Sequence, residues 1–287
     1  MIRFLIAAVL SLAVINADQI AQAEESANTL HMGIFPRRGA AITAKMFTPL
    51  SEGLAKALGR KVVLETTHDF ATFWQNVNQQ RYDIVHYNQY HYVRSHKDLG
   101  YQVIAHNVEF GHSQIAGAIL VRKDAGIHSL QDLKGKKIAF GGGRKAMQAY
   151  IATTYLLREA GLNKGDYFEQ FALNPPKACI ATYYHQATAA GAGDYVLELP
   201  LVKKEIDVEE MQYLAVGEKL PHLPWAVSKS VSPELKNKIQ EYMINLGNNE
   251  QGKAILKSAG LTNLISAKDS DFDAHRRIIK VVLDEDL

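Results

Sequence analysis

The amino-acid sequence predicts an α/β protein of two lobes, each with a mostly parallel sheet flanked by helices, and with two segments that cross between the lobes. Strand-like and helix-like stretches alternate through most of the chain, an order typical of parallel sheets covered by helices. The 287 residues exceed one ordinary domain and fit two lobes of roughly 100–150 residues each. Pro221, Pro224 and Trp225 precede a mainly helical tail, so we expect the chain to cross back to the first lobe there.

Residues 1–23 have the three parts of a secretory signal peptide. Residues 1–3 are cationic, residues 4–15 form an uncharged apolar run, and Ala21, Gln22 and Ala23 form a small-x-small cleavage site. A membrane-spanning helix needs about 20 apolar residues, so a permanent anchor is disfavoured. The only cysteine, Cys179, is far from this site, which argues against a lipid anchor. We expect cleavage near Ala23 and export to the periplasm.

The first lobe is expected over residues 24–118. Apolar residues at three- and four-residue spacing predict the helices, and β-branched or continuous apolar runs predict the strands. Gly59 ends the first helix. The strands are expected at 30–35, 61–65, 82–87, 102–108 and 116–121, and the helices at 44–58 and 70–79.

The second lobe is expected over residues 119–224, and residues 225–287 are expected to return to the first lobe with C-terminal helices. Ser232 and Pro233 form a helix start, with a cap followed by proline at the first position. The two hinge crossings are expected near 116–123 and 222–227. The remaining strands are expected at 137–140, 167–172 and 194–199, and the helices at 129–135, 145–160, 178–190 and 269–284.

Composition excludes several classes of protein. The formal net charge is only +2, which argues against a nucleic-acid binder, because such proteins usually carry a concentrated basic patch. One cysteine excludes an intramolecular disulfide and Cys-rich zinc motifs. His86 and His91 have no acidic or cysteine partner at ligand spacing, so no metal site is predicted. The 11 scattered histidines leave a metal or metalloid ligand open. No cofactor is implied.

Several segments carry a resemblance to a known family. Residues 118–127 with 129–135 are the most specific, and residues 30–36, 83–93, 139–141 and 156–162 extend the match over nearly the whole mature chain. They resemble the periplasmic binding components of phosphate/phosphite/phosphonate-type ABC transporters, which have the type II periplasmic binding protein fold. Ligands of open α/β folds lie in a crevice at the carboxyl ends of the strands, and hinge motion closes the lobes.

The resemblance implies a monomeric receptor that binds a small ligand, closes, and delivers it to an inner-membrane ABC permease. One alternative is a sensory receptor of the same fold that docks on a histidine kinase and detects an oxyanion or a thiophilic metalloid such as arsenite. A second alternative is an enzyme. The only candidate for a nucleophile and base is Cys179 with His185, and residues six apart do not share a helix face, so an enzyme is disfavoured.

The loop after the predicted strand at 137–140 departs from the family. The family carries a Ser-Thr-Ser-Gly run there, whereas this chain reads Gly142, Gly143, Arg144, Lys145, Ala146 and Met147. Backbone N–H groups at a helix start can still bind an anion, and Arg144 and Lys145 add positive charge. We therefore expect an anionic ligand, with a binding loop that is atypical for phosphonates.

The other candidate ligand contacts follow from the resemblance and from the chemistry of their neighbourhood. Tyr92 matches the family's ligand-contacting aromatic residue, Lys177 replaces a family histidine, and Asp194 lies one position after a family aspartate. Cys179 lies in the first turn of a predicted helix, where a thiol can bind soft species. The predicted ligand-binding residues are Phe35, Arg37, Tyr87, Asn88, Tyr92, Arg144, Lys145, Lys177, Cys179 and Asp194.

Overall fold

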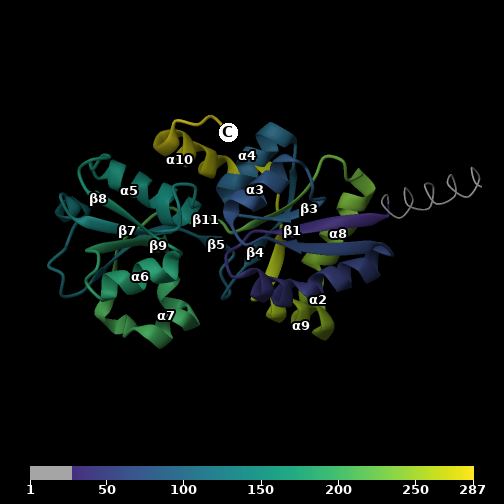
Figure 1. Ribbon diagram of the computed structural model, residues 1–287, viewed down its shortest axis with the longest axis horizontal. Helices are drawn as coiled ribbons and strands as arrows, with labels where there is room; N and C mark the ends of the chain where they lie inside the picture. Colours follow the sequence, from purple (N-terminus) through teal and green to yellow (C-terminus); the bar gives the residue numbers. More distant parts are fainter. Residues whose placement is uncertain (1–27) are drawn as a thin grey trace, which may run out of the picture.

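The computed structural model describes residues 28–287, and the signal peptide predicted at residues 1–23 lies outside them. Two lobes lie side by side along the longest axis of the molecule (Figure 1). Each lobe contains one mixed sheet with helices on both faces. The two-lobed α/β fold predicted from the sequence is confirmed. Within residues 28–287, no helix combines the length and the hydrophobicity needed to cross a membrane.

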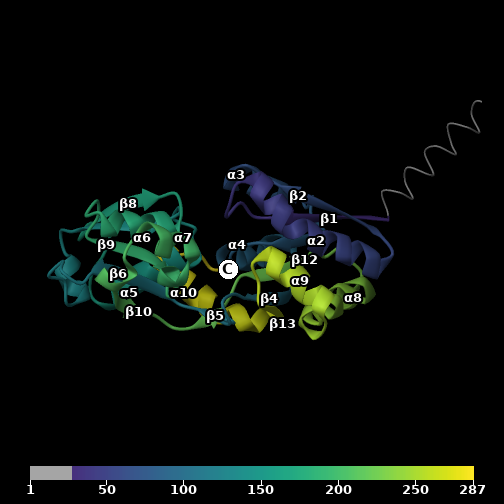
Figure 2. The same cartoon turned by 90° about the horizontal axis from the view of Figure 1, so that it is seen from below.

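The sheet of lobe 1 has six strands in the order β13-β4-β12-β3-β1-β2. β1 pairs in parallel with β2 and β3, whereas β12 runs antiparallel to both β3 and β4. Helices α2, α8 and α9 pack together on one face, and α3 and α4 contact each other on the other face (Figure 2). The strands are β1 (Thr29–Ile34), β2 (Lys61–Thr66), β3 (Ile84–His86), β4 (Gln102–Val108), β12 (Pro224–Val227) and β13 (Asn263–Ser266). The helices are α2 (Ala40–Leu58), α3 (Phe70–Asn78), α4 (Gln89–Leu99), α8 (Pro233–Ile244) and α9 (Glu250–Ala259).

The sheet of lobe 2 has five strands in the order β10-β6-β9-β7-β8. β7 pairs in parallel with β8 and β9, and β6 runs antiparallel to β9 and β10. Four strands of each sheet therefore run in one direction and a minority oppose them. The strands are β6 (Gly117–Arg122), β7 (Lys137–Gly141), β8 (Phe168–Ala172), β9 (Ala189–Gly193) and β10 (Met211–Val216). The helices are α5 (Thr153–Glu159), α6 (Pro175–Tyr183) and α7 (Pro200–Glu205).

Several elements of lobe 2 differ from the sequence expectation, and α7 and β10 were not expected at all. The helix predicted at 178–190 ends at Tyr183 and is followed by strand β9. The strand predicted at 194–199 is instead a 3₁₀ turn, Val196–Glu198. The helix predicted from 145 begins as a π-helical segment, Met147–Ala152, before it continues as α5. π-Helical turns are rare in proteins, and those that occur are often at functional sites. The segment therefore marks the loop that precedes it as a candidate part of the site.

The two crossings between the lobes lie earlier than the sequence suggested. β6 belongs to the sheet of lobe 2 and β12 to the sheet of lobe 1, so neither is a hinge. The crossing segments pair with each other through the short antiparallel strands β5 (Gln114–Ile115) and β11 (Leu220–Pro221). This two-stranded connection joins the lobes along one edge.

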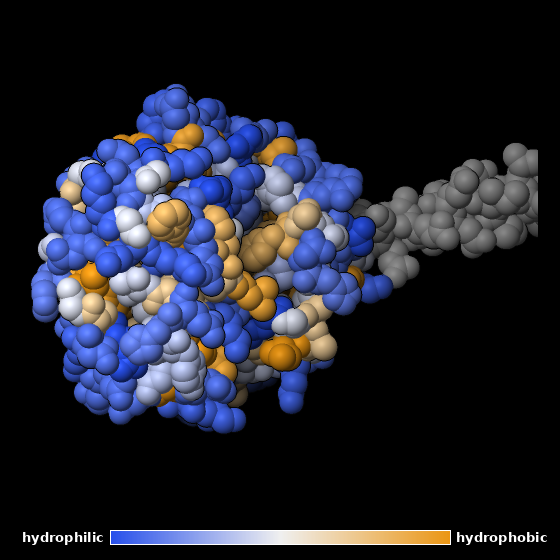
Figure 3. All heavy atoms as spheres, turned by 60° about the vertical axis from the view of Figure 1, so that its left-hand side comes forward, coloured by the Kyte–Doolittle hydropathy of each residue, from blue (hydrophilic) through white to orange (hydrophobic). Residues whose placement is uncertain are grey.

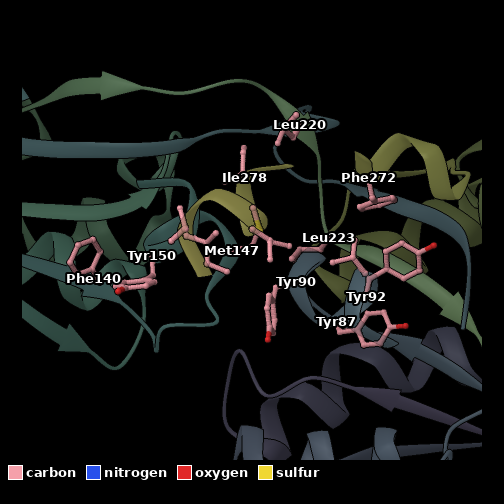
Figure 4. Close-up of a cluster of buried hydrophobic side chains, with 14 of the residues drawn as sticks. Tyr87, Tyr90, Tyr92, Phe140, Met147, Tyr150, Leu220, Leu223, Phe272 and Ile278 are labelled. Carbon is pink, nitrogen blue, oxygen red and sulfur yellow. The ribbon is translucent and has the colours of Figure 1, made fainter. Parts of the chain in front are cut away.

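The C-terminal helix, α10 (Asp273–Leu283), contacts both lobes and not lobe 1 alone. It packs against α4 of lobe 1 and against α5 and the π-helical segment of lobe 2. One buried apolar cluster follows the same path: Figure 4 shows Tyr87 and Tyr92 at one end, Phe140 and Tyr150 at the other, and Met147 between them. The lobes therefore share a packed seam on this side of the molecule.

Candidate functional site

A cleft of about 1470 Å³ lies between the two lobes. Lobe 1 lines it with the loop after β1, with α3 and with the start of α4, and lobe 2 lines it with residues 141–149, the start of α6 and the start of α7. The crossing segments form its floor. Figure 3 shows apolar atoms interrupting the mostly hydrophilic surface where the lobe in front meets the one behind. This cleft is lined by both lobes and is the candidate ligand site.

Glycines shape the rim that lobe 2 contributes. A Cβ on Gly141 would lie 2.3 Å from the Cα of Pro175, so only glycine lets the end of β7 approach the start of α6 this closely. Gly142 has a φ of +105°, a backbone conformation that favours glycine. The loop then reaches lobe 1, where Asn88 Nδ2 donates a hydrogen bond of 3.1 Å to the carbonyl oxygen of Lys145.

An ion pair lies at the floor of the cleft. Arg37 donates two hydrogen bonds to the carboxylate of Glu109, which also accepts one from Asn107 Nδ2 at 2.9 Å. Burial would raise the pKa of Glu109, but Arg37, the nearby His222 ring and these hydrogen bonds outweigh it and hold that pKa well below its usual range. Tyr195 of lobe 2 hydrogen-bonds to His222, so this network joins a lobe 2 residue to the hinge.

The other cations of the cleft differ in how they are neutralised. Arg144 forms an ion pair with Glu169 and a hydrogen bond to Tyr150, so its charge is compensated within lobe 2. The Lys145 Nζ lies 5.8 Å from the centre of the Tyr90 ring, and this cation–π contact leaves its charge uncompensated. Neither Arg38 nor Lys145 forms an ion pair with any residue in the described part of the chain.

The structure brings half of the predicted ligand-binding residues together. Arg37 and Arg144 are committed to carboxylates, and Asn88 caps α4 by accepting hydrogen bonds from His91. Lys145 is the predicted cation that keeps a free charge. The predicted residues that line the cleft are Phe35, Arg37, Asn88, Arg144 and Lys145.

Tyr87 and Tyr92 do not reach the cleft, which corrects the sequence expectation. Both are fully buried in lobe 1. The Tyr87 hydroxyl pairs with Ser95 at 2.7 Å, and the Tyr92 hydroxyl donates to Asp269 at 2.6 Å. Burial raises the pKa of both phenols. Tyr92 lies on α4 and Tyr87 just before it, and both rings belong to the buried apolar cluster.

Lys177, Cys179 and Asp194 are likewise outside the cleft lining. Lys177 is exposed to solvent on α6, and Cys179 is fully buried beneath that helix. Burial raises the pKa of the Cys179 thiol to about 12, so it is a packing residue and not a soft-ligand site. Asp194 accepts a hydrogen bond from the Ala116 N–H at 3.0 Å and pairs with Lys219 at 2.6 Å, so it stabilises the hinge.

Sequence reasoning missed the aromatic wall that lobe 1 presents to the cleft. Phe70 and Trp74 lie four residues apart on α3 and both line the cleft. His91 stacks on Phe70 at 5.9 Å between ring centres and contacts Trp74 at 4.9 Å. Burial lowers the pKa of His91 to about 3, so this ring is neutral at pH 7. Spacing of four on a helix also describes a core-facing stripe, so the sequence alone could not separate these two roles.

Two glutamines were also missed. Gln89 is almost fully buried, and its Nε2 donates to the Pro221 carbonyl at 3.1 Å, which leaves its Oε1 without a partner. Gln148 Nε2, on the opposite lobe, is buried and unpaired as well. Both side chains line the cleft. An unpaired buried polar atom is unfavourable, so a closing lobe or a ligand can gain free energy by satisfying these two groups.

The chemistry of the cleft suits non-covalent binding. Among the residues the structure describes, no group of three histidine, cysteine or acidic side chains could hold a metal ion. The described cleft residues are four cations, one carboxylate, neutral rings and side-chain amides, together with apolar walls. Such a site attracts an anion and holds an apolar surface, and the described residues supply no nucleophile paired with a base.

Comparison of the sequence with known proteins identifies a family of binding proteins, in agreement with a cleft suited to non-covalent binding. A family described as "ABC transporter, phosphonate, periplasmic substrate-binding protein" matches residues 32–272. The chain is 23% identical over 254 residues to the phosphonates-binding periplasmic protein of Escherichia coli, covering 87% of this chain and 75% of that one. It is 27% identical over 224 residues to the tetrathionate sensor histidine kinase TtrS of Salmonella typhimurium, covering 72% of this chain and 36% of the kinase.

Solved structures share the fold. PhnD1 from Prochlorococcus marinus, solved in complex with methylphosphonate, superimposes with a TM-score of 0.76 at 14% identity, covering 90% of this chain and 99% of that one. At this identity the similarity establishes the fold. The family match spans both lobes and nearly the whole described chain. The chain therefore belongs to the periplasmic substrate-binding proteins of phosphonate-type ABC transporters.

Proposed function

We propose that this protein is the periplasmic receptor of an ABC importer and that it closes on a small anion held between its lobes. One observation carries the proposal: two cations without an ion-pair partner among residues 28–287, Arg38 on lobe 1 and Lys145 on lobe 2, line the same cleft. An anion between them would be attracted from both sides and would favour the closed state, because closure brings both charges nearer to it.

The rest of the proposal follows from the family and the fold. The signal peptide predicted at residues 1–23 would direct the chain to the periplasm, and the receptor, a monomer by this proposal, would deliver its ligand to an inner-membrane permease. The cleft between the lobes gives them room for hinge closure about the β5–β11 connection. Because Cys179 is buried with a raised pKa, the single thiol supports no covalent chemistry, and we propose that the protein is not an enzyme.

A thermal-shift screen of the mature protein tests the anion. The panel contains inorganic phosphate, phosphite, methylphosphonate, methanesulfonate, acetate, arsenite and divalent cations. We expect at least one of the anions to raise the melting temperature, and the double variant Arg38→Ala/Lys145→Ala to lose that shift. Lys177→Ala, an exposed lysine outside the cleft, is the matched control and should keep it. Stabilisation by divalent cations alone would contradict the proposal.

A sensory role is the second candidate, and the similarity to a tetrathionate sensor kinase over 72% of this chain supports it. Both roles use the same clamp, so they differ in what deletion of the gene does. An importer receptor is needed for uptake of radiolabelled ligand. A sensor leaves uptake intact and removes the transcriptional response to that ligand. Uptake of methylphosphonate, or of the anion found in the screen, by a deletion strain and its complemented parent separates the two roles.

A further inference from the structure

Phe110 occupies an unusual backbone conformation at the floor of the cleft. Glu109 and His112 exchange two backbone hydrogen bonds, of 3.0 and 2.8 Å, around a two-residue turn formed by Phe110 and Gly111. Phe110 has a φ of +53° and Gly111 a φ of +80°. Two-residue turns with both central residues at positive φ favour asparagine, aspartate or glycine. A phenylalanine at the first of these positions is sterically unfavourable, and residues in such conformations cluster at functional sites.

The Phe110 ring makes few packing contacts that could offset this backbone strain. It is 44% exposed, lines the cleft, and its nearest described aromatic neighbour is Tyr195, with ring centres 6.0 Å apart. A buried ring could offset the backbone strain by packing, but a half-exposed one contributes far less. The position therefore combines a strained backbone with an exposed aromatic surface directed at the ligand site.

Other exposed apolar side chains converge on the same cleft. Phe70 projects from α3 of lobe 1, whereas Leu173 and Leu201 project from lobe 2, and all three are more than 40% exposed. Large apolar side chains that are exposed together in one concavity mark a binding surface. The aromatic wall of Phe70, Trp74 and His91 thus lies on one lobe and an aliphatic lip on the other, with Phe110 between them at the hinge.

A small oxyanion would use only the polar part of the cleft lining. In the part of the chain that the structure describes, no serine or threonine lines the cleft. A bare phosphate or sulfate presents only oxygens and leaves the apolar walls wet. An amphiphilic anion suits both the free cations and the apolar walls of the cleft. Its acid group can lie near Arg38 and Lys145 while its apolar body covers the walls.

We infer that the ligand is an organic anion with an apolar body about the size of an aromatic ring, and that Phe110 selects for that body. This inference rests on the proposed function and narrows its ligand class. The Phe110 ring forms the floor against which the body packs, and the strain of its turn is retained because the exposed ring serves binding.

Isothermal titration with matched acids tests the inference. Phenyl and methyl forms of phosphonate, sulfonate and carboxylate are titrated into the mature protein. For each acid group that binds, we expect the phenyl form to bind about ten-fold or more tightly than the methyl form, as burial of a ring predicts. Equal or tighter binding of the methyl form overturns the inference and leaves the proposed function standing. Absence of binding by every organic anion and by inorganic phosphate overturns both.

The variant Phe110→Asn separates a binding role from a structural one. We expect it to raise the melting temperature, because asparagine suits the turn, and to reduce the phenyl-to-methyl affinity ratio to about three-fold or less. If the Phe110 ring only stabilised the fold, the variant would show the opposite results: a lower melting temperature and an unchanged phenyl-to-methyl affinity ratio. Phe168→Asn is the control, since Phe168 is 67% exposed on β8, an edge strand, and lies outside the cleft lining. This control should leave the ratio unchanged.

Discussion

Arg37 and Glu109 form a two-point ion pair at the floor of the cleft. Arg37 Nη1 lies 2.8 Å from Glu109 Oε1, and Nη2 lies 3.3 Å from Oε2. The carboxylate is almost completely buried, whereas the arginine side chain remains about one-third exposed. The pair commits Arg37 to the protein, so the adjacent Arg38 is the residue of the first loop whose charge remains for a ligand.

Arg37→Ala and Arg38→Ala should therefore have different consequences. Loss of Arg37 leaves a buried carboxylate without its partner, and because Arg37 is 34% exposed the cost should lie somewhat below the about 3–5 kcal/mol of a fully buried pair. Loss of Arg38 should change the free energy of unfolding by no more than about 0.5 kcal/mol, as for other exposed positions. Urea unfolding measures the stabilities, and titration with the best anion of the screen should show the larger affinity loss for Arg38→Ala. Equal destabilisation by both variants would contradict this division.

Gly141→Ala should destabilise lobe 2, and Gly143→Ala should not. The new Cβ at Gly141 would overlap the backbone of Pro175, and overpacking of this kind costs about 1–3 kcal/mol. A Cβ at Gly143 meets nothing within 4 Å. Thermal melts of the two variants, one at the end of β7 and one in the loop that follows it, provide the comparison. A Gly141→Ala protein as stable as the parent would show that β7 and α6 do not approach as closely as described.

The protein should lose stability below neutral pH, partly through His275. This ring is fully buried, neither nitrogen has a hydrogen-bond partner in the described structure, and burial lowers its pKa to about 3. The unfolded imidazole has a pKa near 6.5, so the unfolded state binds a proton that the folded state excludes. The stability from the neutral ring is complete above pH 6.5 and decreases as pH falls toward 3.

His275→Leu tests this titration. We expect the variant to be more stable than the parent at pH 5, and its loss of stability between pH 6 and pH 4.5 to be smaller by about 1.4 kcal/mol per pH unit. Urea unfolding at a series of pH values gives both quantities. The neighbouring charges that face this ring, Arg276 and His106, remain in the variant. An unchanged pH slope would mean that the ring titrates in the folded protein as it does in water.

Cys179 should be chemically silent in the folded protein. Its thiol is free, fully buried, and has a pKa raised to about 12, so the thiolate is scarce at pH 7. We expect no reaction with a thiol reagent until denaturant is added, then one equivalent. Arsenite should leave the melting temperature unchanged. Rapid native labelling, or stabilisation by arsenite that Cys179→Ala removes, would restore the thiophilic alternative.

Much of the fold was predictable because most strands are β-branched and most helices are amphipathic. β9 was missed because its sequence, five alanines and glycines, carries no strand preference. Its composition follows from packing: a Cβ on Gly191 would lie 2.5 Å from the carbonyl oxygen of Ala149 in the π-helical segment. Close approach of a helix to a central strand thus selects small residues, and that requirement is tertiary.

The site was less predictable than the fold. Tyr92 and Trp74 are both aromatic residues on helices of lobe 1, yet one is in the core and the other faces the cleft. Which face of a helix borders solvent depends on the partner lobe, and a single sequence does not give that arrangement. Which cations are free for a ligand was equally unpredictable from the sequence. The carboxylates that neutralise Arg37 and Arg144 lie 72 and 25 residues away along the chain.

Intrinsic fluorescence tests the central claim, an organic anion bound between the lobes, most directly. The chain has two tryptophans, Trp74 in the cleft and Trp225 fully buried in lobe 1. Titration of the parent protein with phenylphosphonate should produce a saturable change in emission. Trp74→Phe should bind the same compound by calorimetry and show no change. A change that persists in Trp74→Phe, or binding of phenylphosphonate that leaves the parent's emission unaltered, would place the ligand outside this cleft.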